Sequence, residues 1–143
     1  MMTEPAAVVR TFFDVVRSGC DPDGAAAFMA PRVVAHQLTS EGEGTVERTP
    51  AEYAAHVREM LAAYGQFRLE LTEVLADGDR VYVRWRQTGI HRREIDGFVP
   101  TGLPLVEIAS AVYRVAEGRI AEYWIQIDRE GLRTQLERRA VTR

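Results

Sequence analysis

The sequence predicts an α+β fold, in which a curved, antiparallel or mixed sheet wraps around N-terminal helices to form a cone. Apolar residues recur at helical spacing in most of residues 5–64, whereas over residues 66–127 they alternate with polar residues. Turn sequences divide the alternating part into hairpins. The length of 143 residues and the 46% hydrophobic content are those of one globular domain, which we place at residues 1–143.

Three helices are predicted before the hairpins. The first covers residues 5–18, where apolar side chains share one face: Val8, Val9, Phe12, Phe13 and Val16. A short second helix follows over residues 21–30 and stops at a proline. The third covers residues 49–64 and starts with the capping box Thr49-Pro50-Ala51-Glu52.

Between the second and third helices the sequence predicts a brief strand and a mobile loop. The strand carries Val34, His36 and Leu38 on one face. The loop is Thr39–Thr45, which is rich in serine, glycine and glutamate.

Two hairpins and a closing helix complete the prediction. The hairpins cover residues 66–90 and 105–127, with turns at Asp77-Gly78-Asp79 and Glu117-Gly118. The closing helix covers Arg129–Arg139 and is short and strongly charged. Because helices must cover one face of the twisted sheet, we expect a cone that holds a ligand where side chains leave it open.

Composition excludes several functions. The net charge of -3 includes no cationic stripe, so nucleic acid is not expected as a partner. All 18 basic residues are arginine, so no lysine is available for Schiff-base chemistry. The lone Cys20 cannot form an internal disulfide, and we find neither a signal peptide nor a long apolar run. We therefore expect a cytoplasmic protein with no membrane partner.

The last predicted strand suggests the chemistry. One of its faces combines aromatic and polar residues, which is typical of a pocket wall: Glu122, Trp124, Gln126 and Asp128. Asp128 is the best candidate for a general base. It also immediately precedes the closing helix, where aspartate is a preferred N-cap, and both roles are open.

Histidines offer further candidates. We expect His36 and His91 to line the cavity, whereas His56, on a helix edge, is interpreted as structural. Two histidines and one carboxylate are also the ligand set of non-haem iron oxygenases. Because the sequence has no close-spaced pair of ligands, we predict no metal site.

The sequence resembles the SnoaL-like polyketide cyclases over nearly its whole length. The similar segments are 78–85, 88–92, 100–102, 113–115, 117–120 and 122–128. This resemblance implies the nuclear transport factor 2 fold and a cofactor-free aldol cyclisation of a small hydrophobic, polyketide-like substrate. In that reaction Asp128 would be the general acid/base, and His36 or His91 would stabilise the oxyanion.

The expected substrate-binding residues are Trp124, Trp85, Tyr53, Gln126, Phe12 and Met60. Two positions depart from the family pattern: Tyr123 stands where the family usually has a histidine, and Gln126 stands near positions where the family usually has small residues. The shape of the pocket and the substrate are therefore expected to differ.

Two other functions stay open, because the fold hosts many activities. One is epoxide hydrolysis of the limonene type, which uses two aspartates and an arginine. The strand with Arg80, Arg84 and Arg86 has no such aspartate. The other is a non-catalytic module that binds small molecules. Exposed sheet surface predicts a homodimer.

Overall fold

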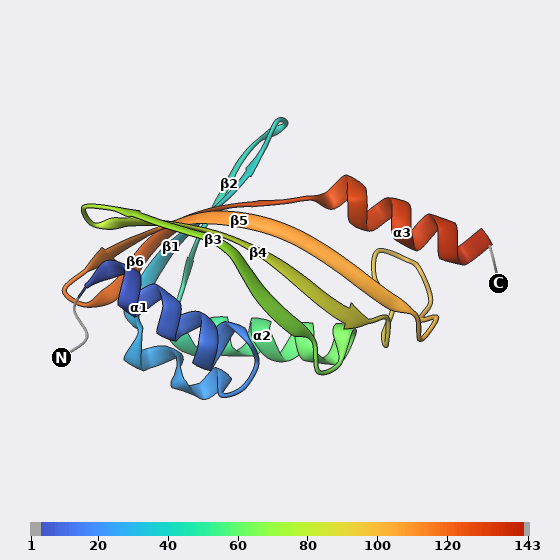
Figure 1. Ribbon diagram of the computed structural model, residues 1–143, viewed down its shortest axis with the longest axis horizontal. Coiled ribbons are helices and arrows are strands. Elements are labelled where there is room, and N and C mark those ends of the chain that lie inside the picture. Colours follow the sequence, from blue (N-terminus) through green and yellow to red (C-terminus); the bar gives the residue numbers. More distant parts are fainter. Residues whose placement is uncertain (1–3, 142–143) are drawn as a thin grey trace.

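The computed structural model describes residues 4–141 and shows a curved sheet above two of its helices (Figure 1). The elements, in chain order, are α1 (Pro5–Phe12), η1 (Phe13–Arg17), η2 (Pro22–Ala27), β1 (Met29–Thr39), β2 (Gly42–Arg48), α2 (Pro50–Tyr64), β3 (Arg68–Asp77), β4 (Arg80–Ile90), β5 (Pro104–Ala116), β6 (Arg119–Ile127) and α3 (Arg129–Val141). The predicted α+β class is confirmed.

The six strands form one mixed sheet in the order β2-β1-β6-β5-β4-β3. All neighbouring strands are antiparallel except β1 and β6, which are parallel. β2 and β3 lie at opposite edges and do not pair with each other, so the sheet is open and not a closed barrel.

The core fills the space between the concave face of the sheet and the N-terminal helices. Phe12 packs on Tyr113 of β5 with ring centroids 6.0 Å apart, and Phe13 packs on Trp85 of β4 at 5.2 Å. Each of these two phenylalanines is at most 1% exposed. Burying such a side chain contributes about 1.5–3 kcal/mol to stability, so this aromatic layer fixes the helices against the sheet.

The first helix does not keep α-helical winding to its end. In η1 the amide of Ser18 donates to the carbonyl of Phe13, five residues earlier, at 2.9 Å, which is the π-helical bond. Buried side chains recur at every fourth position along both segments: Val8, Phe12 and Val16 in one row, and Val9, Phe13 and Arg17 in the next. Arg17 therefore lies on the buried face of the helix.

The predicted loop Thr39–Thr45 is wrong, because most of it belongs to the hairpin of β1 and β2. Thr45 pairs with His36 of β1, and Gly42 pairs with Thr39. Every residue of β2 except Arg48 is exposed. An exposed edge strand needs no alternation of apolar and polar residues, so its sequence resembles a loop.

The start of α2 follows the predicted capping box. The amide of Glu52 donates to Oγ1 of Thr49 at 3.1 Å, and the amide of Thr49 donates to Oε1 of Glu52 at 2.9 Å. The helix begins at Pro50, which has no amide hydrogen to leave unpaired. This cap fixes where α2, one wall of the site described below, begins.

The closing helix α3 extends beyond the end of the sheet (Figure 1). It is anchored by Leu136, which is 2% exposed, and by Gln135, whose amide group exchanges hydrogen bonds with the backbone of Val106 in β5. Within residues 4–141, no helix has the length and apolar character needed to span a lipid bilayer.

Candidate functional site

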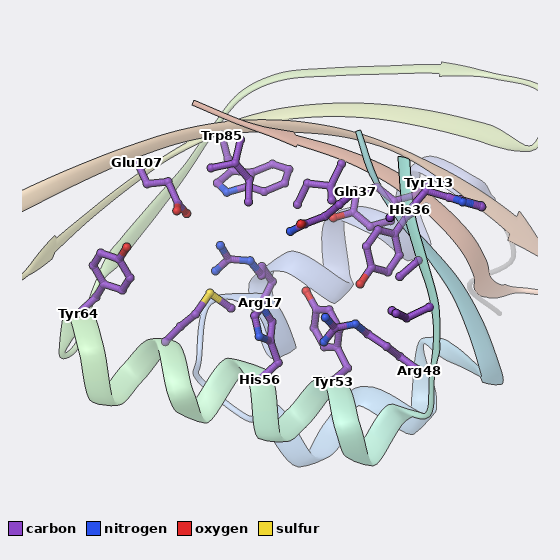
Figure 2. Close-up of a pocket in the computed structure, with 17 residues that line it drawn as sticks. Arg17, His36, Gln37, Arg48, Tyr53, His56, Tyr64, Trp85, Glu107 and Tyr113 are labelled. Atoms are coloured by element: carbon purple, nitrogen blue, oxygen red, sulfur yellow. The ribbon is translucent and has the colours of Figure 1, made fainter. Parts of the chain in front are cut away.

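A cavity of about 420 Å³ lies between α2 and the concave face of the sheet. Figure 2 shows Trp85 and Glu107 descending from the sheet and Tyr53, His56 and Tyr64 rising from α2. The volume of this cavity lies within the usual range for small-molecule sites, about 300–1,000 Å³. The cone is therefore open enough to hold a ligand, as the sequence predicts.

The face of β6 that lines this cavity is the opposite of the predicted one. Tyr123, Ile125 and Ile127 line it, whereas Trp124 and Gln126 do not. Successive residues of a strand point to opposite faces, so a change of one position exchanges the whole set. Because helices cover the more apolar face of the sheet, the cavity lies on that side.

Asp128 does not line the cavity, so its predicted place in the pocket wall is wrong. Its side chain is exposed, and Oδ1 accepts the backbone amide of Gly131 at 2.9 Å. This is the N-cap geometry of α3. Of the two roles open from the sequence, the structure thus shows the cap.

His36 borders the cavity, but its imidazole is engaged with partners on the outer face of the sheet. The ring stacks on Trp124 with centroids 5.2 Å apart and an interplanar angle of 14°. Nε2 lies 2.6 Å from Oε2 of Glu122, and Nδ1 lies 2.8 Å from Oγ1 of Thr45. The bond to His36 is the first cause that holds the pKa of Glu122 below its usual value. This network accounts for two of the residues that the sequence suggested as a pocket wall, Glu122 and Trp124.

His91 lies outside the main cavity, contrary to expectation. It is 1% exposed and neither ring nitrogen has a hydrogen-bond partner. It borders a separate hollow of about 330 Å³ beside Phe98 and Leu136. His36, His91 and Asp128 do not converge, and the described part of the chain contains no group of three His, Cys, Asp or Glu side chains placed to hold a metal ion.

Three of the six expected binding residues line the cavity, namely Trp85, Tyr53 and Met60. Phe12 is fully buried behind the wall, with its ring centroid 5.4 Å from that of Tyr53. It supports the cavity without lining it.

Glu107 of β5 is the only carboxylic acid among the described residues that line the cavity, and sequence reasoning missed it. Burial raises its pKa, and the nearby cations Arg17 and Arg129 lower it by less. A carboxyl group with a raised pKa is suited to proton transfer near neutral pH. In the sequence, Glu107 is the one charged residue at the alternate positions of β5 from Leu105 to Val115 that are otherwise apolar or aromatic.

Arg17 places a cation near the middle of the cavity, between its two walls (Figure 2). The side chain is 4% exposed, and its Cζ lies 5.6 Å from the ring centroids of both Phe67 and Trp85. It forms no ion pair within the described residues, and its Nη1 has no hydrogen-bond partner. A buried guanidinium held mainly by aromatic rings is free to bind an acceptor.

Arg48 and His56 line the same cavity. The Arg48 side chain extends from β2 toward Tyr53 (Figure 2), and its buried Nε has no hydrogen-bond partner. Desolvation is the largest cause that lowers the pKa of His56 to about 4, and the charges of Arg48 and Arg17 contribute to the same shift. His56 is therefore neutral at pH 7, and the residue that the sequence suggests to be structural lines the cavity.

Four tyrosines also line the cavity: Tyr53, Tyr64, Tyr113 and Tyr123. Burial raises the pKa of each phenol above its usual value, so all four stay neutral at physiological pH. Neutral hydroxyl groups can donate hydrogen bonds to carbonyl oxygens of a ligand. Tyr123 occupies the position where the resembled family has histidine.

Solved structures with the same fold include candidate polyketide cyclases and an epoxide hydrolase. A candidate polyketide cyclase from Acidithiobacillus ferrooxidans is 27% identical, with a TM-score of 0.81 over 96% of this chain and 98% of that one. IdmH, a candidate polyketide cyclase from Streptomyces antibioticus, is 24% identical, with a TM-score of 0.77 over 94% and 99%. An epoxide hydrolase from M. tuberculosis that is similar to limonene epoxide hydrolases is 21% identical, with a TM-score of 0.68 over 98% and 94%.

A search of curated proteins finds no match to this sequence. The sequence profile of the SnoaL-like polyketide cyclases, in contrast, matches residues 7–136, which include every element from η1 to β6 and most of α3. The architecture agrees with this match, because the similar solved structures share the nuclear transport factor 2-like fold. The chain therefore belongs to the SnoaL-like polyketide cyclase family.

Proposed function

We propose that this chain is a cofactor-independent enzyme that closes a ring in a small polyketide-like substrate, with Glu107 as the general acid/base. The observation that carries the proposal is the position of Glu107, a carboxyl group in a cavity whose other lining side chains include the cations Arg17 and Arg48 but no other carboxylic acid among the described residues. Burial raises the pKa of this group. This replaces the expected role of Asp128, which caps α3.

The proposed reaction is an intramolecular aldol addition. The Glu107 carboxylate removes a proton from the carbon next to a substrate carbonyl, which leaves an enolate. The enolate carbon forms a bond to a second carbonyl carbon of the same chain, and that carbonyl oxygen becomes an alkoxide. The Glu107 carboxylic acid then returns the proton to the alkoxide, so the enzyme is restored.

Hydrogen-bond donors in the cavity support this charge development. Arg17 and the indole Nε1 of Trp85 both present buried N–H groups without a partner. Donors fixed in a site of low polarity stabilise an enolate or alkoxide more strongly than water does. We assign these N–H groups of Arg17 and Trp85 to the substrate oxygens on which negative charge develops.

The aromatic walls would fold the flexible substrate. Tyr113 and Tyr123 pack with ring centroids 5.5 Å apart, and Tyr53 lies 6.5 Å from Tyr123. A continuous aromatic surface favours a compact conformation in which the two reacting carbons are close.

Proton abstraction can be tested without the natural substrate. The methyl group of 2-acetylnaphthalene exchanges slowly with D₂O, and NMR follows its deuteration. We expect the protein to accelerate this exchange and Glu107→Gln to reduce the acceleration about 10²–10⁴-fold, because glutamine cannot accept the proton. Asp128→Asn is the matched control and should exchange at the wild-type rate. Equal acceleration by Glu107→Gln and wild type would contradict the proposal.

Epoxide opening is a second candidate function. The observation that favours it is the combination of a carboxyl group and a guanidinium in the cavity, in a chain whose fold is shared by an epoxide hydrolase. Here the Glu107 carboxylic acid would protonate the epoxide oxygen while a water molecule attacks carbon and the C–O bond breaks. The attached water would then return a proton to the Glu107 carboxylate, which gives a diol and restores the acid. Conversion of styrene oxide to its diol, dependent on Glu107, would favour this reaction over ring closure.

The homodimer stays a prediction. The outer face of the sheet carries the half-buried Trp124, and Arg80 lies over this indole with Cζ 4.7 Å from the ring centroid. We propose that a second copy covers this face. Sedimentation velocity should give the mass of two chains, and Trp124→Glu should reduce it to one.

A further inference from the structure

We infer that the natural ligand of the cavity is an anion, namely an aromatic or polyketide-like compound that carries a carboxylate group. This inference rests on the proposed function only in that it concerns the same cavity. It adds to that function a fixed negative charge on the substrate, which the aldol reaction itself does not require.

The first support is the kind of polar atom that has no partner. Three buried side-chain atoms of the described residues lining the cavity lack a hydrogen bond, and they belong to Arg17, Arg48 and Trp85. All three atoms are N–H donors: Nη1, Nε and Nε1. Leaving a buried donor without an acceptor destabilises the fold, so the arrangement is suited to a ligand rich in acceptor oxygens.

The second support is the charge of the cavity. Arg17 and Arg48 both line it, and no ion pair is formed by either guanidinium within residues 4–141. Glu52 lies near enough to Arg48 to feel its charge, but its carboxylate bonds to the backbone of Thr49. The cavity is thus cationic although the chain has a net charge of -3, and this contrast favours an anionic ligand.

The third support comes from Glu107, which is the one carboxyl group among the described residues that line the cavity. It forms no ion pair with Arg17 or Arg48. Figure 2 shows Glu107 beside Tyr64, whereas Arg48 lies beside Tyr53 toward the other end of α2. A carboxylate held near Arg48 and Arg17 would leave the rest of an aromatic ligand against Trp85 and Met60, within reach of Glu107.

The test compares two ligands that differ in charge and little in shape, 2-naphthoate and 2-naphthamide. We expect the wild-type protein to bind 2-naphthoate at least about 10-fold more tightly at pH 7, measured by isothermal titration calorimetry, because charge-assisted hydrogen bonds to arginine are stronger than neutral ones. Arg48→Gln and Arg17→Gln should each reduce this preference, and Arg86→Gln is the control, since Arg86 is exposed outside the cavity.

Circular dichroism identifies variants that fail to fold, and the more exposed Arg48 keeps the test valid if Arg17→Gln unfolds. Equal affinity for the two ligands, tighter binding of the amide, or no binding of either ligand would overturn the inference. So would a preference that survives both substitutions.

Failure of this inference differs from failure of the proposed function. Glu107→Gln should still prefer 2-naphthoate, because glutamine leaves both arginines in place. If charge preference is absent but deuteration depends on Glu107, only the inference fails. If charge preference is present but deuteration is independent of Glu107, only the acid/base role fails.

Discussion

The backbone amide of Gly131 donates a 2.9 Å hydrogen bond to Oδ1 of Asp128, and this bond joins the end of β6 to the first turn of α3. The carboxylate that follows the last strand is thereby committed to the helix. A Cβ added at Gly131 would clash with Oδ2 of Asp128, so a larger residue there would require this carboxylate to shift.

The first prediction separates the cap from a catalytic role of Asp128. Asp128→Ala should lower the free energy of unfolding by about 0.5–2 kcal/mol, because it removes the cap, whereas Asp128→Asn should keep most of the stability. Urea unfolding measures both variants. Loss of turnover in Asp128→Asn with unchanged stability would return the catalytic role to Asp128.

The second prediction concerns the pH dependence of the proposed reaction. A general base must be ionised, and burial raises the pKa of Glu107. The rate should therefore fall on acidification at a pH above the ordinary range of glutamate. The charge of Arg17 lowers the pKa of Glu107, so Arg17→Gln should move the acidic limb of the pH–rate profile to higher pH.

The groups that act on Glu107 are Arg17 and Arg129, and Glu107 in turn raises the pKa of Tyr64. Deuteration rates of 2-acetylnaphthalene between pH 4 and pH 9 measure the limb. If the acidic limb of the pH–rate profile does not move in Arg17→Gln, the charge of Arg17 does not act on Glu107. Arg86→Gln is the control, since it changes a charge on the outer face.

The third prediction concerns stability in mild acid. The imidazole of His56 takes up its proton near pH 4 in the folded protein and near pH 6.5 in the unfolded chain. The unfolded state therefore binds more protons between these values, so stability falls as the pH decreases from 6.5 toward 4.

His56→Gln removes this contribution. Because the His56 side chain is exposed at the cavity, we expect the loss between pH 7 and pH 5 to be smaller in the variant by only about 1 kcal/mol. Urea unfolding at the two pH values measures it. Identical losses in wild type and variant would show that the imidazole titrates normally.

The fourth prediction tests the contact between β4 and α2 that closes one end of the cavity. A Cβ at Gly89 would lie 2.7 Å from both the Cβ and the backbone oxygen of Tyr64. Backbone cannot move as a side-chain tip does, so Gly89→Ala should destabilise by about 1–3 kcal/mol. Gly44→Ala is the matched control, because a Cβ there meets nothing within 4 Å. Equal thermal unfolding temperatures for the two variants would contradict this account.

The sequence was sufficient to predict the elements in which the spacing of apolar residues reflects which side chains are buried. The capping box of α2 and the hairpins of β3–β4 and β5–β6 occur as predicted, because local propensity and pattern agree there. The strand β2 was missed, since an exposed edge imposes no pattern. The parallel pairing of β1 with β6 also depends on contacts between distant segments, which periodicity does not specify.

The site was predicted less well, for a reason that follows from strand geometry. Alternation in β6 defined two faces, but a mixed face with Trp124 suits a pocket wall and an outer-face network equally well. Which face the helices cover is a tertiary property. Glu107 and Arg17 were missed because each is a single polar residue in an apolar pattern. One such residue does not indicate from the sequence that its side chain lines a cavity.

The five-residue turn at Phe13–Arg17 has a consequence for how the helix could change length over evolution or by design. Removal of one residue from this turn would let it rewind as ordinary α-helix, in which the bond from Ser18 would span four residues in place of five. Because the chain makes about one helical turn between the two bonded residues in either form, the residues after the deletion would keep their orientation. Loss of the exposed Asp14 would therefore leave the guanidinium of Arg17 in the ligand chamber, so this turn can absorb the loss of one codon without loss of the buried cation.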